Sequence, residues 1–349
     1  MREMMENIDR KIRKNRKQLY RQRQRLKRQI CFALCAFFMA LVILQIRDID
    51  RQLKQIQMVL KRIELPQYES EHEPEIFDRG ENTSPEADYV SSIGVLNVER
   101  PMQRTWTETL GRLDTLGQAD SVIARISEES SLYPEKMLTA LANNPEMADY
   151  VAGYLSGNGT DSTSAGLSEL EKRQPFPLFL QWDPRWGYES YGSDSFIGVS
   201  GCGPTCLSMV LYYLTGDESL TPDRIADYAI ENGYYVEGTG TAWALIKDFP
   251  RFYGIRVTEP EKSEQAFRSE LDQGNMLVCA MGKGDFTTAG HFIVIYGYDD
   301  AGFKVNDPNC VARSRKRWDF ESIGGQIKNV WSMSGSGVTE KRDTVYIKL

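Results

Sequence analysis

The chain has 349 residues, of which 41% are hydrophobic and 26% are charged, so it is long enough for about two domains. Its formal net charge of -7 conceals an asymmetry, because the first 29 residues carry twelve Lys or Arg against three acidic residues. The remaining, acidic body argues against nucleic acid as a partner. The six cysteines form no CxxC pair and no regular spacing, which excludes a disulfide framework and an evident zinc site.

A short apolar segment follows the basic region. Residues 30–46 (ICFALCAFFMALVILQI) carry no charge and have about the minimum length that spans a bilayer. The preceding basic block, and the lack of a small-residue cleavage site afterwards, favour an uncleaved transmembrane signal anchor over a core helix or a cleaved signal peptide. Because Lys and Arg are more numerous before the segment than after it, we expect residues 1–29 to form a basic cytoplasmic tail, and the rest of the chain to lie outside the cytoplasmic membrane. The tail is expected to rest on anionic lipid headgroups, with nucleic-acid binding by the tail as the alternative.

Apolar residues then recur in steps of three and four from Ile46 to Ile63, as in a heptad repeat. This pattern predicts a short coiled-coil-like helix over 47–64, and a homodimer formed through residues 46–63. It covers only about two and a half heptads, so a juxtamembrane helix with an apolar stripe is the alternative.

The rest of the chain divides by composition. Residues 65–104 are acidic and polar and are expected to form a flexible linker. Helical periodicity and two well-placed prolines predict a helical region over 105–156, and GNGTDSTSAG marks a second linker over 157–173.

Residues 174–349 are expected to form an α+β domain, because helical patterns come first and short apolar runs with tight turns come later. The helices are predicted near 204–214, 222–231, 241–248, 263–272 and 319–328. The strands, which suggest an antiparallel sheet, are predicted near 255–258, 275–281, 291–298, 302–306 and 343–348.

One string carries the clearest chemical signal. In GCGPTCLSMV (201–210), Pro204 fits the first turn of a helix that runs to Gly216, so Cys202 is expected at the N-terminal end of that helix. The unpaired N–H groups and the dipole at this end favour a thiolate, and the flanking glycines leave room for a substrate carbonyl. We therefore predict Cys202 as a nucleophile, against the alternative of a buried structural cysteine.

Two alternatives use a second cysteine. Cys206 lies one turn further into the helix, where the dipole effect has faded, and we interpret it as a core residue rather than the nucleophile. A metal site made from Cys202, Cys206 and His291 is the weakest interpretation, because no spacing provides a fourth ligand. We expect neither a metal nor a cofactor.

A nucleophilic cysteine needs a base, and the chain has only two histidines. His72 lies in the acidic linker, whereas His291 begins the alternating apolar run HFIVIYGY, which is typical of a strand. Taken alone, His291 would be interpreted as a buried core histidine. Because Cys202 needs a base, the interpretation of His291 as that base is favoured instead. His291 is therefore assigned as the base by elimination.

The base needs an orienting partner. The strand that begins at His291 turns at DDAG (299–302) and returns as FKVNDP, which brings Asn306 or Asp307 back beside His291. Alternation puts these two residues on opposite faces of the strand, and we favour Asp307 as the carboxylate that holds the imidazole.

An oxyanion that develops during the reaction needs hydrogen-bond donors. The backbone N–H of Cys202 is one candidate. Gln181, within LQWDPRWG (180–187), offers a side-chain amide as a second donor, although an ordinary surface glutamine is an equally good interpretation.

These strings occur in an order that resembles the peptidase domain of cysteine peptidase family thirty-nine, the bacteriocin-processing type, and more closely its stand-alone subgroup. QWDPRWG is followed by GCGPTCLSMVL, GHFIVIYGYDD, NDPN and RKRWDF, over about 174–331. The resemblance implies a papain-like fold in which the Cys-bearing helix packs on an antiparallel sheet that bears His and Asp. It places the catalytic order on Cys202, His291 and Asp307, and the oxyanion glutamine on Gln181. The string YPEKMLTALANNPEMADYV is similar to a helical segment that often precedes such domains in Gram-positive bacteria.

The best-known members of this family sit on ATP-driven exporters and cleave leader peptides inside the cell. This sequence has no nucleotide-binding motif, and its expected anchor puts the domain outside. We therefore expect a membrane-anchored extracytoplasmic cysteine peptidase that hydrolyses peptide or related amide bonds in a peptide or protein substrate, or transfers the acyl group to an amine. The alternatives are a catalytically silent peptide- or cell-wall-binding module on the same fold, and a lipid-surface scaffold.

Overall fold

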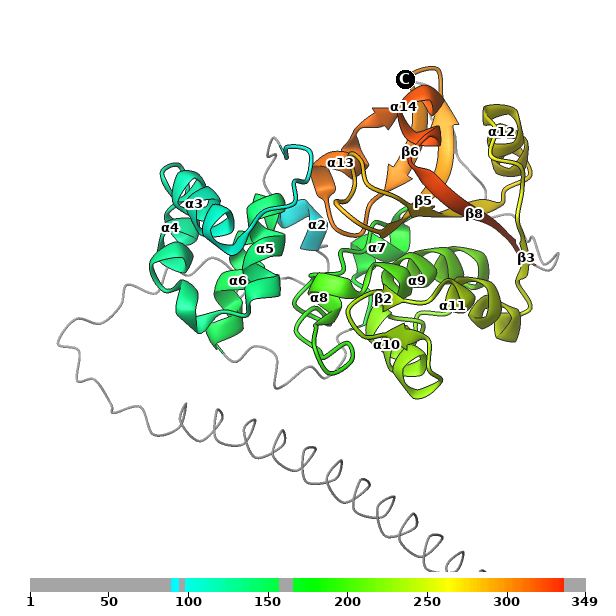
Figure 1. The fold of residues 1–349 in the computed structure, drawn as a ribbon. Coiled ribbons are helices and arrows are strands. Elements are labelled where there is room, and N and C mark those ends of the chain that lie inside the picture. The colour runs from blue at the N-terminus through cyan, green and yellow to red at the C-terminus, as the bar shows by residue number, and fades with distance from the viewer. Residues whose placement is uncertain (1–88, 94–97, 157–165, 336–349) are drawn as a thin grey trace, which may run out of the picture. The chain divides into compact units, whose positions relative to one another are not determined.

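The computed structural model describes residues 89–93, 98–156 and 166–335, which belong to one compact unit (Figure 1). The predicted tail, anchor and coiled-coil-like helix lie outside the described residues, as does the strand predicted at 343–348. Among the helices of the described ranges, none combines the length and the hydropathy that a membrane crossing requires.

Residues 98–156, here called the helical segment, form a small bundle whose first two helices begin at side-chain caps. Thr105 and Glu108 form a capping box, in which Glu108 N donates to Thr105 Oγ1 at 3.3 Å and Thr105 N donates to the Glu108 carboxylate at 2.7 Å. Asp120 caps the next helix by accepting from Val122 N at 2.8 Å. The helices of the bundle are α3 (Trp106–Gly117), α4 (Ser121–Glu128), α5 (Glu135–Asn143) and α6 (Ala148–Gly153). The 3-10 turn η1 (Ser130–Leu132) lies between α4 and α5, η2 (Pro145–Met147) lies between α5 and α6, and η3 (Tyr154–Ser156) follows α6.

The remaining helices lie in residues 166–335, apart from α2 (Tyr89–Ser92), which precedes the bundle. Helix α7 is short and lies within the linker expected over 157–173. Helix α2 likewise lies within the linker expected over 65–104. The helices are α7 (Glu169–Arg173), α8 (Ile197–Ser200), α9 (Cys202–Thr215), α10 (Pro222–Glu231), α11 (Trp243–Asp248), η4 (Phe249–Tyr253), α12 (Glu264–Asp272), α13 (Val311–Arg315) and α14 (Phe320–Gly324).

A six-stranded antiparallel sheet follows in the order β3-β8-β4-β5-β6-β7, so the predicted α+β class is confirmed. A separate two-stranded hairpin lies before it along the chain. The strands are β1 (Tyr235–Val236), β2 (Gly240–Thr241), β3 (Arg256–Thr258), β4 (Met276–Met281), β5 (His291–Asp299), β6 (Gly302–Asn306), β7 (Arg317–Trp318) and β8 (Ile327–Ser334).

The sheet is covered on both faces, which explains why its central strand β4 is apolar throughout. Helix α9 packs against β4 and β5 on one face, and α12 packs against the same strands on the other (Figure 1). Alternate residues of β4 therefore enter different clusters: Met276, Val278 and Ala280 join the α9 cluster, and Leu277, Cys279 and Met281 join the α12 cluster.

One predicted element is wrong. The helix expected over 319–328 ends at Gly324, and the chain continues as β8, a strand absent from the expectation. Gly324 and Gly325 weaken the helix, and β8 then pairs with both β3 and β4. Tertiary pairing therefore overrides the local helical pattern.

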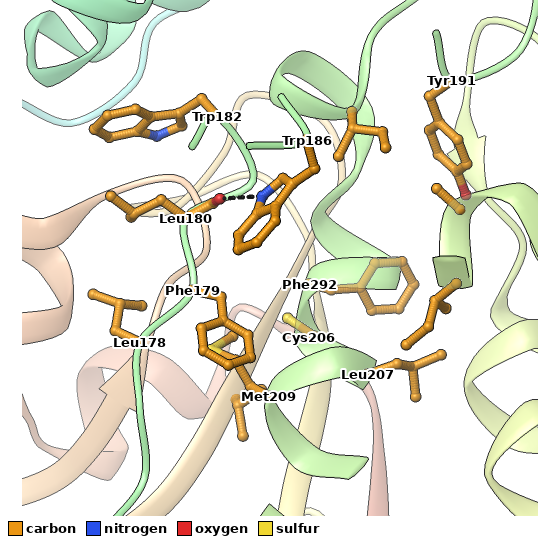
Figure 2. Close-up of a cluster of buried hydrophobic side chains, with 14 of the residues drawn as sticks. Leu178, Phe179, Leu180, Trp182, Trp186, Tyr191, Cys206, Leu207, Met209 and Phe292 are labelled. Atoms are coloured by element: carbon orange, nitrogen blue, oxygen red, sulfur yellow. Dashed lines mark hydrogen bonds between the residues drawn. The ribbon is translucent and has the colours of Figure 1, made fainter. Parts of the chain in front are cut away.

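Aromatic residues attach the chain before α9 to the body of the domain. Figure 2 shows Phe179 and Trp186 among the side chains that pack beside α9, close to the buried Cys206, and Trp186 Nε1 donates to Leu180 O at 2.8 Å. Each buried aromatic side chain removes about 150–250 Å² from water, worth on the order of 4–6 kcal/mol before the cost of ordering it. This packing fixes the segment that carries Gln181.

Candidate active site

Cys202 is the first residue of α9, with Gly201 as the N-cap. Its side chain is half-buried, whereas the other described cysteines are fully buried. Gly203 has no room for a side chain, because a Cβ there would lie 2.7 Å from the side chain of Thr241. The sequence thus leaves Cys202 as the accessible thiol among the described cysteines, at the helix end that favours an anion.

His291 is the first residue of β5, and it pairs with Met281 of β4. Its Nε2 lies 2.7 Å from Asp307 Oδ1, and the side chain of Cys202 acts on the same ring and raises its pKa. Because Nε2 is occupied by the carboxylate, Nδ1 is the nitrogen left for the thiol. The chain therefore brings together a thiol, an imidazole and a carboxylate from α9, β5 and the end of β6.

Asp307 follows β6 directly and is fully buried. Beyond the contact with His291, its Oδ1 accepts from Asn309 N at 2.8 Å and its Oδ2 accepts from Arg313 Nε at 2.6 Å. Asn306 points elsewhere, because its Nδ2 donates to Pro177 O at 3.0 Å. Of the two alternatives left open by the sequence, the carboxylate is the one placed beside the imidazole.

The buried charges of His291 and Asp307 shift each other's pKa values. Burial would lower the pKa of His291, but the charge of Asp307 and the hydrogen bonds to Asp307 and Cys202 raise that pKa to about 9. Burial would likewise raise the pKa of Asp307, but Arg313 and His291 lower it to about 2. The imidazole is thus held as an imidazolium at neutral pH, with Asp307 as a carboxylate.

The other cysteines are poor candidates for a nucleophile. Burial raises the pKa of Cys206 well above its ordinary value, and burial also raises the pKa values of Cys279 and Cys310. Thiolates would therefore be rare at all three positions near neutral pH.

Gln181 is buried rather than a surface glutamine. Its Nε2 donates to Gly198 O at 3.1 Å, while its Oε1 has no hydrogen-bond partner among the described residues. An amide nitrogen carries two hydrogens, so one remains for a ligand. Because Gln181 lines the same cleft as Cys202 and His291, that hydrogen is available to a developing oxyanion.

The cleft around Cys202 has a volume of about 410 Å³ and two distinct walls. One wall is the loop 286–290 before β5. The other comes from the helical segment, whose α5 contributes its exposed and half-buried face while its opposite face enters the core. The lining residues from α5 are Glu135, Lys136, Thr139, Ala140 and Asn143.

Sequence reasoning missed two parts of this site. Arg313 is buried, and it binds the carboxylate of Asp307 from the side opposite His291. The contribution of α5 to the cleft was also missed. The signal for Arg313 was weak, since RSRKR reads as an exposed basic run, and no periodicity links α5 to a cysteine more than fifty residues later.

No group of three or more His, Cys, Asp or Glu residues in the described parts of the chain is arranged to hold a metal ion. His72, the other histidine, lies outside those parts. The chemistry that the site can support is therefore considered from its thiol, imidazole, carboxylate and amide.

Comparison with known proteins gives a family for this region. The model of the peptidase C39-like family matches residues 173–338. The peptidase domain of Streptococcus ComA, described as a bi-functional ABC transporter involved in a quorum sensing pathway, is similar at 17% identity, with a TM-score of 0.31, over 39% of this chain and 93% of that domain. A putative C39-like peptidase from Bacillus anthracis is similar at 16% identity, with a TM-score of 0.30, over 39% of this chain and 90% of that protein. No curated protein matches the sequence.

Proposed function

Because residues 173–338 belong to the peptidase C39-like family, we propose that this chain hydrolyses peptide or related amide bonds with Cys202 as nucleophile and His291 as acid and base. The observation that supports the proposal is that Cys202 and His291 line one cleft, and that the buried Asp307 holds His291 there. The family alone supports a function of the cysteine-peptidase type. The assignment of residue roles is inferred from their contacts.

In the first half of the proposed reaction, Cys202 reacts as a thiolate whose proton is held on Nδ1 of His291 as the imidazolium. Its Sγ attacks the carbonyl carbon, and the π electrons of the C=O bond move to the carbonyl oxygen. The backbone N–H of Cys202 and the free N–H of Gln181 stabilise that oxyanion. His291 then donates its Nδ1 proton to the leaving amine nitrogen, the C–N bond breaks, and a thioester remains on Cys202.

In the second half, His291 accepts a proton from a water molecule that attacks the thioester carbon. The C–S bond breaks, the acid product leaves, and Cys202 is restored. Asp307 keeps the imidazole oriented and stabilises its charged form throughout. An amine in place of the water would make the same machinery an acyl transferase.

We further propose that residues 30–46 anchor the chain in the cytoplasmic membrane and that the catalytic domain faces outward. The basic tail before the apolar segment supports this orientation. A peptide or protein outside the cell is then the substrate, and a homodimer through residues 46–63 is proposed from the heptad pattern.

The test is covalent labelling with a peptidyl epoxide, followed by identification of the labelled cysteine by mass spectrometry. Cys202 is expected to react, and His291→Ala is expected to reduce labelling nearly as much as Cys202→Ala, since the nucleophile and the base act as one unit. Peptides released from cells with and without Cys202→Ala would then identify substrates. Full labelling and full peptide release in a folded His291→Ala protein would overturn the assignment of His291. A folded chain whose Cys202 is not labelled, and whose Cys202→Ala variant releases the same peptides, would instead favour a catalytically silent binding module.

A further inference from the structure

The loop that follows Asp307 is held by the helical segment. Glu146 is 5% exposed, and its carboxylate accepts from Val311 N at 2.8 Å and from Ala312 N at 2.9 Å. These N–H groups open α13, the helix that carries Arg313. A single buried carboxylate from η2 thus fixes the start of the helix whose arginine binds Asp307.

A second contact from the same turn reaches the loop between Asp307 and α13. Asn144 Nδ2 donates to Asn309 O, and Trp182 Nε1 donates to the same carbonyl at 3.0 Å. Asn309 N in turn donates to Asp307 Oδ1 at 2.8 Å. The carboxylate of Asp307 is therefore positioned by a chain of contacts that begins in the helical segment.

The helical segment is itself attached firmly beside this loop. Tyr150 is fully buried, and its hydroxyl donates to Gly187 O at 2.7 Å. Tyr188 stacks on Tyr150 at a centroid distance of 4.6 Å and donates its hydroxyl proton to Tyr150 O at 2.7 Å. Gly198 lies so close to Tyr150 that a Cβ there would be 2.2 Å from the hydroxyl. A tethered spacer would not need this complementary packing.

We propose that the helical segment is a working part of the active site, and that Glu146 is a positioning residue which orients Asp307, and through it His291, by fixing α13. This inference rests on the proposed function for its catalytic meaning. Glu146 touches neither the thiol nor the imidazole, so its effect passes through the loop and Arg313.

The charged groups between Glu146 and His291 determine the expected effect of a substitution at Glu146. His291 faces Asp307 and Cys202, and Asp307 faces Arg313 on its other side. Glu146 acts electrostatically on Arg313. Glu146→Gln removes that charge and replaces one acceptor oxygen by an NH₂ group, which cannot accept from the N–H of α13. The loop should loosen, and the contact between Asp307 and His291 should weaken.

The experiment measures the titration of His291 directly in the full-length chain in detergent micelles. With ¹³C-labelled histidine the protein gives two ring signals, and His72→Gln identifies the signal of His72. The pKa of His291 is expected at about 9 in the unmodified chain, against an ordinary value of 6.5. In Glu146→Gln it is expected between these two values. The matched control Glu128→Gln, an exposed residue at the end of α4, should leave it at the unmodified value.

An unchanged His291 titration in a folded Glu146→Gln protein would overturn the proposal, even if the melting temperature fell, because a merely structural role would lower stability alone. If Glu146→Gln does not fold, Asn144→Ser provides the same test. Serine keeps an acceptor for Glu146 N, but loses the donor to Asn309 O. The titration requires no peptidase activity, so a failure of the proposed function, seen as unreactive Cys202, is distinguishable from a failure of this inference.

Discussion

At the scale of single residues, the ion pair between Asp307 and Arg313 is the least obvious component of the site. Both side chains are buried, and the Nε–Oδ2 distance is 2.6 Å. The Nη1 and Nη2 atoms of Arg313 have no hydrogen-bond partner among the described residues. Such a pair need not add net stability, but leaving one charge without the other is costly.

Asp307→Asn and Arg313→Met should therefore each lower the free energy of unfolding by about 3–5 kcal/mol, because each leaves an uncompensated buried charge or polar group. The double variant should lose much less than the sum. Urea unfolding of the four proteins measures this coupling. Activity should not return in the double variant, because His291 still lacks its carboxylate. Additive losses of stability would show that the two side chains do not interact as described.

The pH dependence follows from His291, whose pKa is raised to about 9 from 6.5. The imidazolium that protonates the leaving amine is lost as the pH rises through about 9, so kcat/KM should fall there. In Asp307→Asn the same decline should move towards pH 6.5. A decline that stays near pH 9 in Asp307→Asn would assign it to a different group.

The free energy of unfolding should also depend on the protonation of His291, and should likewise fall as the pH rises. A group whose pKa is raised in the folded state stabilises the fold fully below its unfolded pKa, and loses that contribution as the pH rises through its folded pKa. For His291 the free energy of unfolding should thus decrease between about pH 6.5 and 9. Asp307, with a pKa lowered to about 2 from 3.8, contributes above pH 3.8, and its contribution is lost as the pH falls through about 2.

At the scale of elements, α9 is placed by the close contact of its first turn with the β1–β2 hairpin. Gly203 allows this contact, since a Cβ would lie 2.7 Å from Thr241, whose hydroxyl is 2.8 Å from that of Tyr191. The glycine is thus required for space rather than for an unusual backbone conformation. Its neighbour Cys202 depends on the same placement.

Gly203→Ala should destabilise the protein by about 1–3 kcal/mol, because the added methyl group forces the hairpin or the helix to shift. Cys202 labelling should slow as its helix moves. Gly111→Ala is the control: it adds a methyl group to exposed space in α3 and should stabilise by about 0.5–1 kcal/mol. Urea unfolding measures both changes. Equal effects at the two positions would contradict the described contact.

At the scale of the whole molecule, the chain combines a predicted membrane anchor with a proposed catalytic unit, and we propose that this unit includes the helical segment. Helix α5 lines the cleft, and Glu146 of η2 binds the loop after β6, so the helical segment and the residues after 166 contribute to the same site. Residues of the helical segment and residues after 166 together line the cleft.

A phosphatase reporter fused after Leu349, of the kind that folds only outside the cytoplasm, should be active, because the basic tail of residues 1–29 stays inside. Replacement of its twelve basic residues by glutamine should reduce that activity. A reporter that is active only in the cytoplasm, or a chain released intact by signal peptidase, would contradict the proposed orientation.

The sequence alone was sufficient for the features that depend on local order. Glycine and proline around Cys202 indicated the start of α9, alternation after His291 indicated β5, and the order of motifs indicated the family. These signals are local because helix starts and strand periodicity depend on neighbouring residues. Elimination could suggest His291 as a partner because the chain has only two histidines.

Only the tertiary structure decided the features that depend on packing between distant segments. Asp307 lies beyond the end of β6, so strand alternation no longer fixes its direction; Arg313 and the loop after β6 do. The strand β8 exists because β3 and β4 pair with it, against a local pattern that favoured a helix. Glu146 contacts Val311 across 165 residues, and Arg313 is buried although its neighbours read as a surface run. Such contacts form because the whole chain must satisfy its buried charges and N–H groups, and that requirement leaves no local pattern in the sequence.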